Sequence, residues 1–201
     1  EFMELTLAME MQVIFCTPTA TPPSWLTSKY PEVLNADLDG HLIQHGNRRH
    51  NNLTSPKYLE LVARLVTKLA KHYSSYPNII GWQIDNEINC EVDRYYSESD
   101  HQSFRHYLQD KYKTLDELND KMGTTFWNQT YTDWQEIYLT RRTNQPGWTN
   151  PHLQLEERRF ISQIVYNFFK LQADIIRKYI KPNQFITTNG LFGNIDYHKL
   201  V

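Results

Sequence analysis

The apolar positions of this chain follow two patterns: short runs of strand length, and longer stretches with helical spacing. Three runs are rich in β-branched and aromatic residues and end in polar or turn-forming residues, as buried strands do. They are MQVIFCT (Met11–Thr17), IIGWQID (Ile79–Asp85) and QFITTN (Gln184–Asn189). Each follows a segment of helical character, so the pattern predicts strands that alternate with helices.

Helical segments are marked by apolar residues that recur every three or four positions. The clearest runs from Tyr58 to Tyr73, with Ser55 as its N-cap and Pro56 in its first turn. A long amphipathic helix is predicted from Ile161 to Tyr179, before Pro182. We also expect shorter helices over 103–112 and 115–122, and the pattern of residues 1–9 is that of a helix end.

Strands alternating with helices predict a parallel sheet with right-handed crossovers. The long loops after the first two strands then lie at the same end of the sheet, as in a (β/α)8 barrel. We therefore predict the α/β class and part of a TIM barrel. Only three strands are recognisable where eight close a barrel, so residues 1–201 are expected to form part of one such domain.

Charge and cysteine content narrow the function classes. Lys and Arg number 21 against 23 Asp and Glu, which gives no electrostatic reason to expect nucleic acid or an anionic membrane as a partner. No apolar run approaches a membrane span, and no secretion signal is visible. Cys16 and Cys90 do not make a disulfide framework. These features favour reduced thiols and a cytoplasmic location.

The strongest candidate for chemistry is Glu87, which follows the second predicted strand. Carboxyl ends of parallel strands are where α/β enzymes place their catalytic groups. Glycoside hydrolysis needs one carboxylic acid that protonates the departing oxygen and a second carboxylate across the bond. Asn86 can donate a hydrogen bond to a sugar hydroxyl. Alternatively, Asp85, Asn86 and Glu87 only cap the next segment or pair with surface cations.

Three further segments contain candidate binding residues. In GNRRHNN (46–52), Arg48 and Arg49 are forked donors for hydroxyls and carboxylates, or else part of a solvated basic loop. TPTATPPSWL (17–26) is a stiff loop ending in Trp25, which either shapes a pocket or plugs the domain. In GTTFWNQTYTDW (123–134), Trp127 either stacks on a pyranose ring or belongs to the core.

Taken in order, these segments resemble glycoside hydrolase family 42, the β-galactosidases. The resemblance rests on TPTATPPSWL, HGNRRH, SPKY, GWQIDNE, GTTFWNQTYTDW and FITTN, and it extends from about Val13 to the C-terminus. It implies a (β/α)8 catalytic domain and retaining hydrolysis of terminal non-reducing β-D-galactosides, without a cofactor and often within a homotrimer.

The resemblance also assigns residues by position. Glu87 matches the general acid/base, and Asn86 matches the asparagine that precedes it. Arg48 matches the first arginine of the RRH motif, which binds the sugar, and Trp127 matches the tryptophan of the FW pair at the galactose site. The three strands would be the third, fourth and fifth of the barrel.

Two departures from the family pattern matter. Many members hold a structural zinc through a cysteine after RRH and a cysteine cluster after DNE, but this chain has Asn52, Tyr95 and Ser97 there. We therefore predict no metal site. The family's nucleophile is a glutamate on the seventh strand, which these residues do not reach, and Asp196 matches no nucleophile motif. The fragment alone is expected to be inactive.

Two rival functions remain open at this point. One is another barrel glycosidase of the same clan, of the β-mannosidase or glucanase type. The other is a non-catalytic carbohydrate-binding module or pseudoenzyme that retains Arg48 and Trp127 without a nucleophile.

Overall fold

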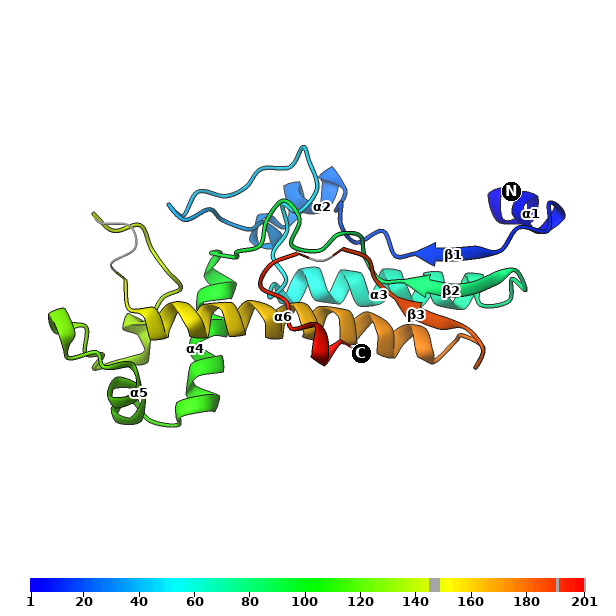
Figure 1. The fold of residues 1–201 in the computed structure, drawn as a ribbon. Coiled ribbons are helices and arrows are strands. Elements are labelled where there is room, and N and C mark those ends of the chain that lie inside the picture. The colour runs from blue at the N-terminus through cyan, green and yellow to red at the C-terminus, as the bar shows by residue number, and fades with distance from the viewer. Residues whose placement is uncertain (145–148, 191, 201) are drawn as a thin grey trace.

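The computed structural model of the chain describes residues 1–144, 149–190 and 192–200. These residues contain a parallel sheet of three strands in the order β1-β2-β3, which lies toward the side of the N-terminal helix (Figure 1). The strands are β1 (Val13–Cys16), β2 (Ile79–Gln83) and β3 (Phe185–Thr187). The α-helices are α1 (Phe2–Ala8), α2 (Ser24–Lys29), α3 (Pro56–Tyr73), α4 (Glu98–Tyr112), α5 (Leu115–Met122) and α6 (Pro151–Arg177). Short 3-10 turns occur at η1 (Pro31–Val33), η2 (Phe126–Asn128), η3 (Trp134–Glu136) and η4 (Tyr197–Lys199).

All three predicted strands form, but each is shorter than its predicted run, and β3 covers only half of it. The predicted cap of α3 is confirmed, because the Ser55 hydroxyl accepts the amide of Tyr58 at 3.3 Å. The helix predicted from Ile161 in fact begins at Pro151, where the Asn150 side chain accepts two backbone amides. An Asn-Pro start is a recognised N-terminal signal, so the true beginning of α6 was marked in the sequence.

One face of the sheet is covered by helices and the other is open. The covered row pairs Phe15 with Trp82 and Trp82 with Ile186, and Trp82 is fully buried. Phe15 packs on Tyr73 of α3. On the open face, the Phe185 ring lies so close to Gly81 that a Cβ there would be 2.5 Å from it. Any larger residue at position 81 would displace that ring.

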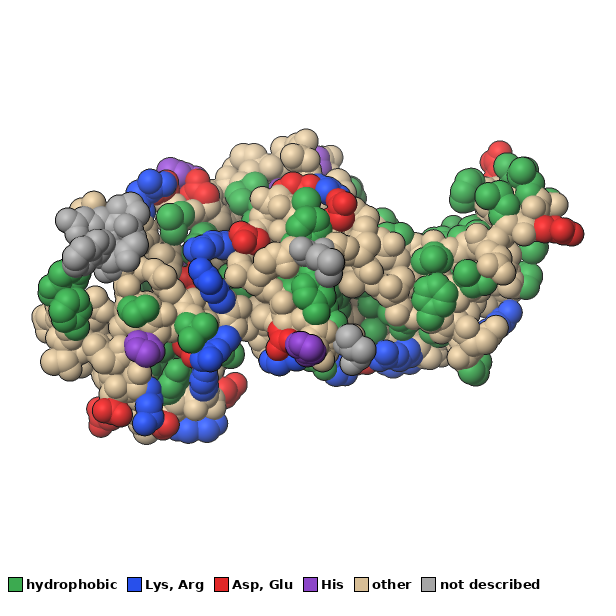
Figure 2. All heavy atoms as spheres, in the orientation of Figure 1, with side chains coloured by type: hydrophobic (Ala, Val, Ile, Leu, Met, Phe, Trp, Pro, Cys, Tyr) green, Lys and Arg blue, Asp and Glu red, His purple; other side chains and the backbone are tan. Residues whose placement is uncertain are grey.

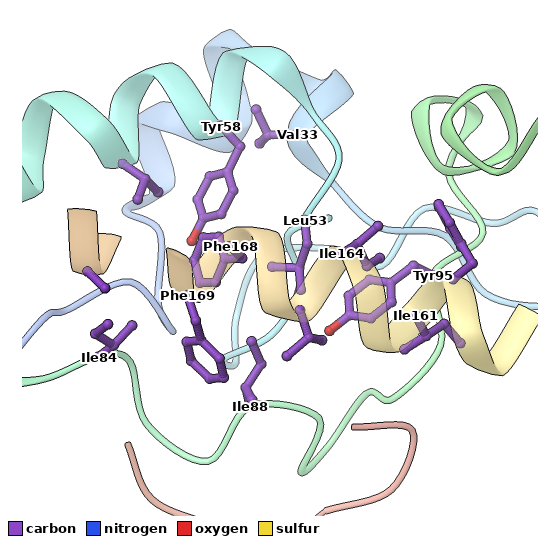
Figure 3. Close-up of a cluster of buried hydrophobic side chains, with 14 of the residues drawn as sticks. Val33, Leu53, Tyr58, Ile84, Ile88, Tyr95, Ile161, Ile164, Phe168 and Phe169 are labelled. Atoms are coloured by element: carbon purple, nitrogen blue, oxygen red, sulfur yellow. The ribbon is translucent and has the colours of Figure 1, made fainter. Parts of the chain in front are cut away.

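The core lies between α3, α6 and the segment that follows β2 (Figure 3). Tyr58 of α3 stacks on Phe168 of α6 with ring centroids 6.1 Å apart. Ile84 and Ile88, from the segment after β2, are buried in the same cluster. These two isoleucines anchor both ends of the segment that carries Asp85, Asn86 and Glu87.

Over residues 1–144, 149–190 and 192–200, none of the helices combines the length and apolar character that crossing a bilayer requires.

Candidate active site

The segment after β2 has an unusual backbone. Asp85, Glu87 and Asn89 have φ angles of 55°, 49° and 62°, in the left-handed region that non-glycine residues seldom adopt. Each such residue costs about 1–3 kcal/mol and persists only when its surroundings hold it. Here Ile84 and Ile88 supply that hold from the core. The backbone therefore fixes the directions in which the polar side chains of this segment point.

Asp85 points into the protein. Its Oδ1 lies 2.5 Å from Nη2 of Arg49, and its Oδ2 accepts the Thr19 hydroxyl at 2.5 Å. Its amide donates to the Thr17 hydroxyl at 2.8 Å, and Arg49 also donates to the carbonyl of Asn86. Asp85 thus joins the end of β2 to the loop after β1 and to the RRH segment.

Glu87 is partly exposed, and its two carboxylate oxygens differ. Oε2 accepts Nη2 of Arg48 at 2.6 Å and Nδ2 of Asn86 at 3.3 Å. Oε1 accepts no hydrogen bond from the described part of the chain. Nε of Arg48 donates to Glu91, and these bonds, that to Glu87 first, raise the pKa of Arg48. Figure 2 shows such mixed acidic and basic side chains over the middle of the molecule.

The RRH segment is held by its histidine. His50 is fully buried, with Nδ1 2.8 Å from the carbonyl of Asn47 and Nε2 3.3 Å from Nδ1 of His45. Burial lowers the pKa of His50, which favours the neutral ring. The contact between His50 and the Asn47 carbonyl holds the backbone on both sides of Arg48. The guanidinium of Arg48 therefore reaches Glu87 from a fixed turn.

A residue that the sequence analysis did not single out completes the cluster. Oδ1 of Asn189, just after β3, accepts the amide of Glu87 at 2.8 Å, and its Nδ2 donates to Oδ1 of Asn86 at 2.9 Å. The next residue, Gly190, has φ +90°, and a Cβ there would be 2.4 Å from the Phe192 ring. The signal for Asn189 was its place at the end of FITTN, equivalent to that of Asn86 after β2.

The structure thus brings Arg48, Asn86 and Glu87 together but sets Trp127 apart. Trp127 lies on η2, and the segment after α5 that contains η2 lies away from the carboxyl ends of the strands (Figure 1). Its ring stacks on Phe126 with centroids 4.7 Å apart and is 57% exposed, so it is not a core residue. Its contact with sugar stays a prediction. Trp25 is also exposed, so it does not fill the core of these 201 residues.

The positions where the family resemblance suggests zinc ligands do not fit that metal. Nδ2 of Asn52 donates to the carbonyls of Glu32 and Leu34, and its Oδ1 accepts the amide of Ser55. The Tyr95 hydroxyl donates to Oδ1 of Asn89, and Ser97 caps α4. A structural zinc site needs thiolate or imidazole ligands, whereas these side chains form hydrogen bonds that the fold itself uses.

Comparison with known proteins identifies the family of this chain. The family profile of glycoside hydrolase family 42, described as β-galactosidase, matches residues 1–201. The chain belongs to glycoside hydrolase family 42. A β-galactosidase from Thermus sp. is 41% identical over 195 residues, which are 95% of this chain and 30% of that protein. One from Halorubrum lacusprofundi is 39% identical over 190 residues, 94% of this chain and 27% of the relative.

Solved structures of the family give the same result. The β-galactosidase of the psychrophilic Marinomonas ef1 matches with a TM-score of 0.92 and 36% identity, covering 98% of this chain and 30% of that chain. The predicted α/β class, with part of a TIM barrel, is confirmed. The chain spans roughly a third or less of the length of the family 42 relatives it matches.

Proposed function

We propose that the whole protein to which these residues belong is a retaining β-galactosidase, acting on terminal non-reducing β-D-galactosides with Glu87 as general acid/base. The whole-chain family match and the relatives named β-galactosidases support the substrate class. One observation supports the role of Glu87 above all others. Its Oε2 is held by Arg48 and Asn86, while its Oε1 accepts no hydrogen bond from any described residue.

In the first step, Oε1 of Glu87 transfers a proton to the glycosidic oxygen as the bond to the anomeric carbon breaks. A second carboxylate attacks that carbon from the opposite side and forms a covalent glycosyl-enzyme. Glu87, now ionised, then takes a proton from the water that releases the sugar. The same side chain is acid in the first step and base in the second.

The second carboxylate is assigned to a part of the protein outside these 201 residues. Glu91 does not suit the role, because the guanidinium of Arg48 lies between it and Glu87. A retaining enzyme needs the reacting sugar between its carboxyl groups, about 5–5.5 Å apart. Asp196 caps η4, where its Oδ1 accepts the amide of His198. This assignment accords with β1, β2 and β3 being the third to fifth barrel strands.

Sugar hydroxyls are bound by donors beside Glu87. Nη1 of Arg48 makes no hydrogen bond within the described residues, so it is available to a hydroxyl of the galactose ring. Asn86 contributes an amide on the same side. Trp127 lies on η2, apart from these donors, and we retain it as a stacking platform for the substrate only because its side chain is exposed.

The test of substrate and outcome uses the whole protein and a panel of nitrophenyl glycosides. The β-galactoside should be the preferred substrate, and nuclear magnetic resonance should detect the β-anomer of galactose first, as retention requires. A clear preference for β-mannoside or β-glucoside would overturn the substrate class. An α-anomer as first product would overturn the retaining mechanism.

The test of Glu87 is its replacement by glutamine. General acid catalysis contributes about 100- to 10,000-fold, so Glu87→Gln should slow hydrolysis of alkyl galactosides by about that factor. Dinitrophenyl galactoside should suffer much less in the step that releases its leaving group, since that group departs without a proton. Glu60→Gln is the matched control, because Glu60 pairs with Lys57 on the exposed face of α3. A small and equal loss on all substrates would place the acid elsewhere.

A further inference from the structure

Arg48 is shared between two carboxylates. Its Nη2 binds Oε2 of Glu87 at 2.6 Å, and its Nε binds Oε1 of Glu91. Nε and Nη2 form the edge of the guanidinium that normally binds one carboxylate through two parallel hydrogen bonds. In this structure that edge is divided, and each carboxylate receives one of its donors.

The division matters because of what an undivided edge would do. If both donors were free, Arg48 could engage both oxygens of Glu87 in the forked geometry that arginine and carboxylate prefer. Oε1 would then accept an N–H and could no longer hold the proton destined for the glycosidic oxygen. By occupying Nε, Glu91 restricts Arg48 to a single oxygen of Glu87.

Glu91 is well placed to hold that position. The amide of Cys90 donates to the carbonyl of Glu87 at 3.0 Å, which turns the chain back toward Arg48. Asn89 is fixed on both sides, since its Oδ1 accepts the Tyr95 hydroxyl at 2.8 Å and its Nδ2 donates to the carbonyl of Gly193 at 3.1 Å. Arg49 cannot replace Arg48 in this arrangement, because it is committed to Asp85 in the interior.

We propose that Glu91 is a positioning residue, which binds Nε of Arg48 and so leaves Oε1 of Glu87 free to donate its proton. The proposal rests on the proposed function of Glu87. Glu91 touches neither the sugar nor the reacting atoms in this scheme. It acts through Arg48 alone. With Glu91 in place, Arg48 can bind the sugar without also binding both oxygens of Glu87.

The experiment measures kcat/KM of the whole protein on two galactosides with different leaving groups. Glu91→Ala should lower the value for methyl β-galactoside about tenfold, a fraction of what general acid catalysis supplies. The value for dinitrophenyl β-galactoside should change less than about twofold, since its departure needs little protonation. Glu91→Gln keeps an acceptor for Nε and should stay close to wild type on both substrates.

A second variant tests the route through Arg48. Lysine has no forked edge, so in an Arg48→Lys background the further change Glu91→Ala should no longer discriminate between the two substrates. If discrimination persists there, Glu91 does not act through Arg48 and the proposal fails. Equal losses on both galactosides in the single variant, or no loss at all, would also overturn it.

Glu87→Gln, measured beside these variants, separates the two proposals. If Glu87→Gln shows no dependence on the leaving group, the acid/base assignment itself is wrong. If Glu87→Gln shows that dependence and Glu91→Ala does not, the acid stands and only the role of Glu91 is refuted. Glu60→Ala, which removes an exposed glutamate from a simple surface pair with Lys57, controls for loss of charge.

Discussion

Arg48 and Arg49 are neighbours in sequence, yet their side chains lie in different environments. The side chain of Arg49 is 4% exposed and pairs with Asp85, which is fully buried. The side chain of Arg48 is 28% exposed and pairs with Glu87 and Glu91, which are 38% and 31% exposed. Arg49 has a φ of 66°, and this left-handed turn accompanies the reversal between the two side chains.

The contrast shows that two adjacent arginines of one loop can form one ion pair in the interior and another at the surface. A buried ion pair depends on close partners, because each ion loses its hydration and an unpaired partner is very costly. A half-exposed pair costs little to open, since water replaces either partner. The interior pair therefore suits a fixed joint between strand ends, and the outer pair suits the proton exchange with substrate that we propose for Glu87.

The largest expected effect comes from breaking the interior pair. Asp85→Asn leaves Arg49 buried without a counter-charge and should destabilise the region by about 3–5 kcal/mol. The measurement is the opening free energy from amide hydrogen exchange of Ile79–Gln83 in the whole protein. Asp174→Asn, in the exposed pair with Lys170, is the control and should change it by less than about 0.5 kcal/mol. Similar losses of opening free energy in both variants would contradict the difference drawn between buried and exposed ion pairs.

Asp100 sharpens the comparison, because it is buried and forms no ion pair with any residue that the structure describes. Its oxygens accept the Ser97 amide and the Thr54 hydroxyl, at 2.9 and 2.6 Å, and burial raises its pKa to about 6. Between about pH 4 and 6 the unfolded chain has lost this proton while the folded chain keeps it, so the contribution of Asp100 to stability is lost as the pH rises.

Replacing Asp100 should change the slope of the unfolding free energy against pH. Relative to wild type, Asp100→Asn should gain about 2–3 kcal/mol of unfolding free energy as the pH rises from about 4 to 6. His101, whose pKa is lowered to about 4 chiefly by burial, contributes the opposite slope, but equally in both proteins. Urea unfolding across this pH range gives the difference. Parallel curves would mean that Asp100 is ionised throughout.

The smallest expected effect concerns the outer pair. Arg48→Lys should change the opening free energy of β2 by less than about 1 kcal/mol, because its partners remain hydrated. Arg49→Lys should cost several times more, since lysine cannot keep the bonds to both Asp85 and the Asn86 carbonyl. The same hydrogen-exchange measurement compares them. A larger effect at position 48 than at position 49 would reverse the assignment of the two arginines.

Much of the fold could be predicted from local pattern. The Ser55-Pro56 start of α3 and the apolar run of β2 are short-range signals, and both appear where expected. The early start of α4 was missed because it depends on a capping box between Ser97 and Asp100, inside a segment of polar residues. Such a segment has little apolar periodicity, so only its caps reveal it.

The site could be predicted only in part. Glu87 and Asn86 follow a recognisable strand, so their position at its carboxyl end was foreseeable. The sequence does not tell which of two adjacent arginines turns inward, since that depends on one left-handed residue and on partners far along the chain. Glu91 and Asn189 were missed for the same reason, because their roles arise from contacts that only the folded chain creates.

The clasp of Asn189 on Glu87 joins residues that are 102 positions apart. During synthesis, the segment that carries Glu87 emerges from the ribosome long before the residue that secures it. The loop after β2 can therefore reach its final shape only once α6 has crossed back and β3 has docked. Completion of the surroundings of Glu87 is thus coupled to one of the last pairings that this part of the chain can make.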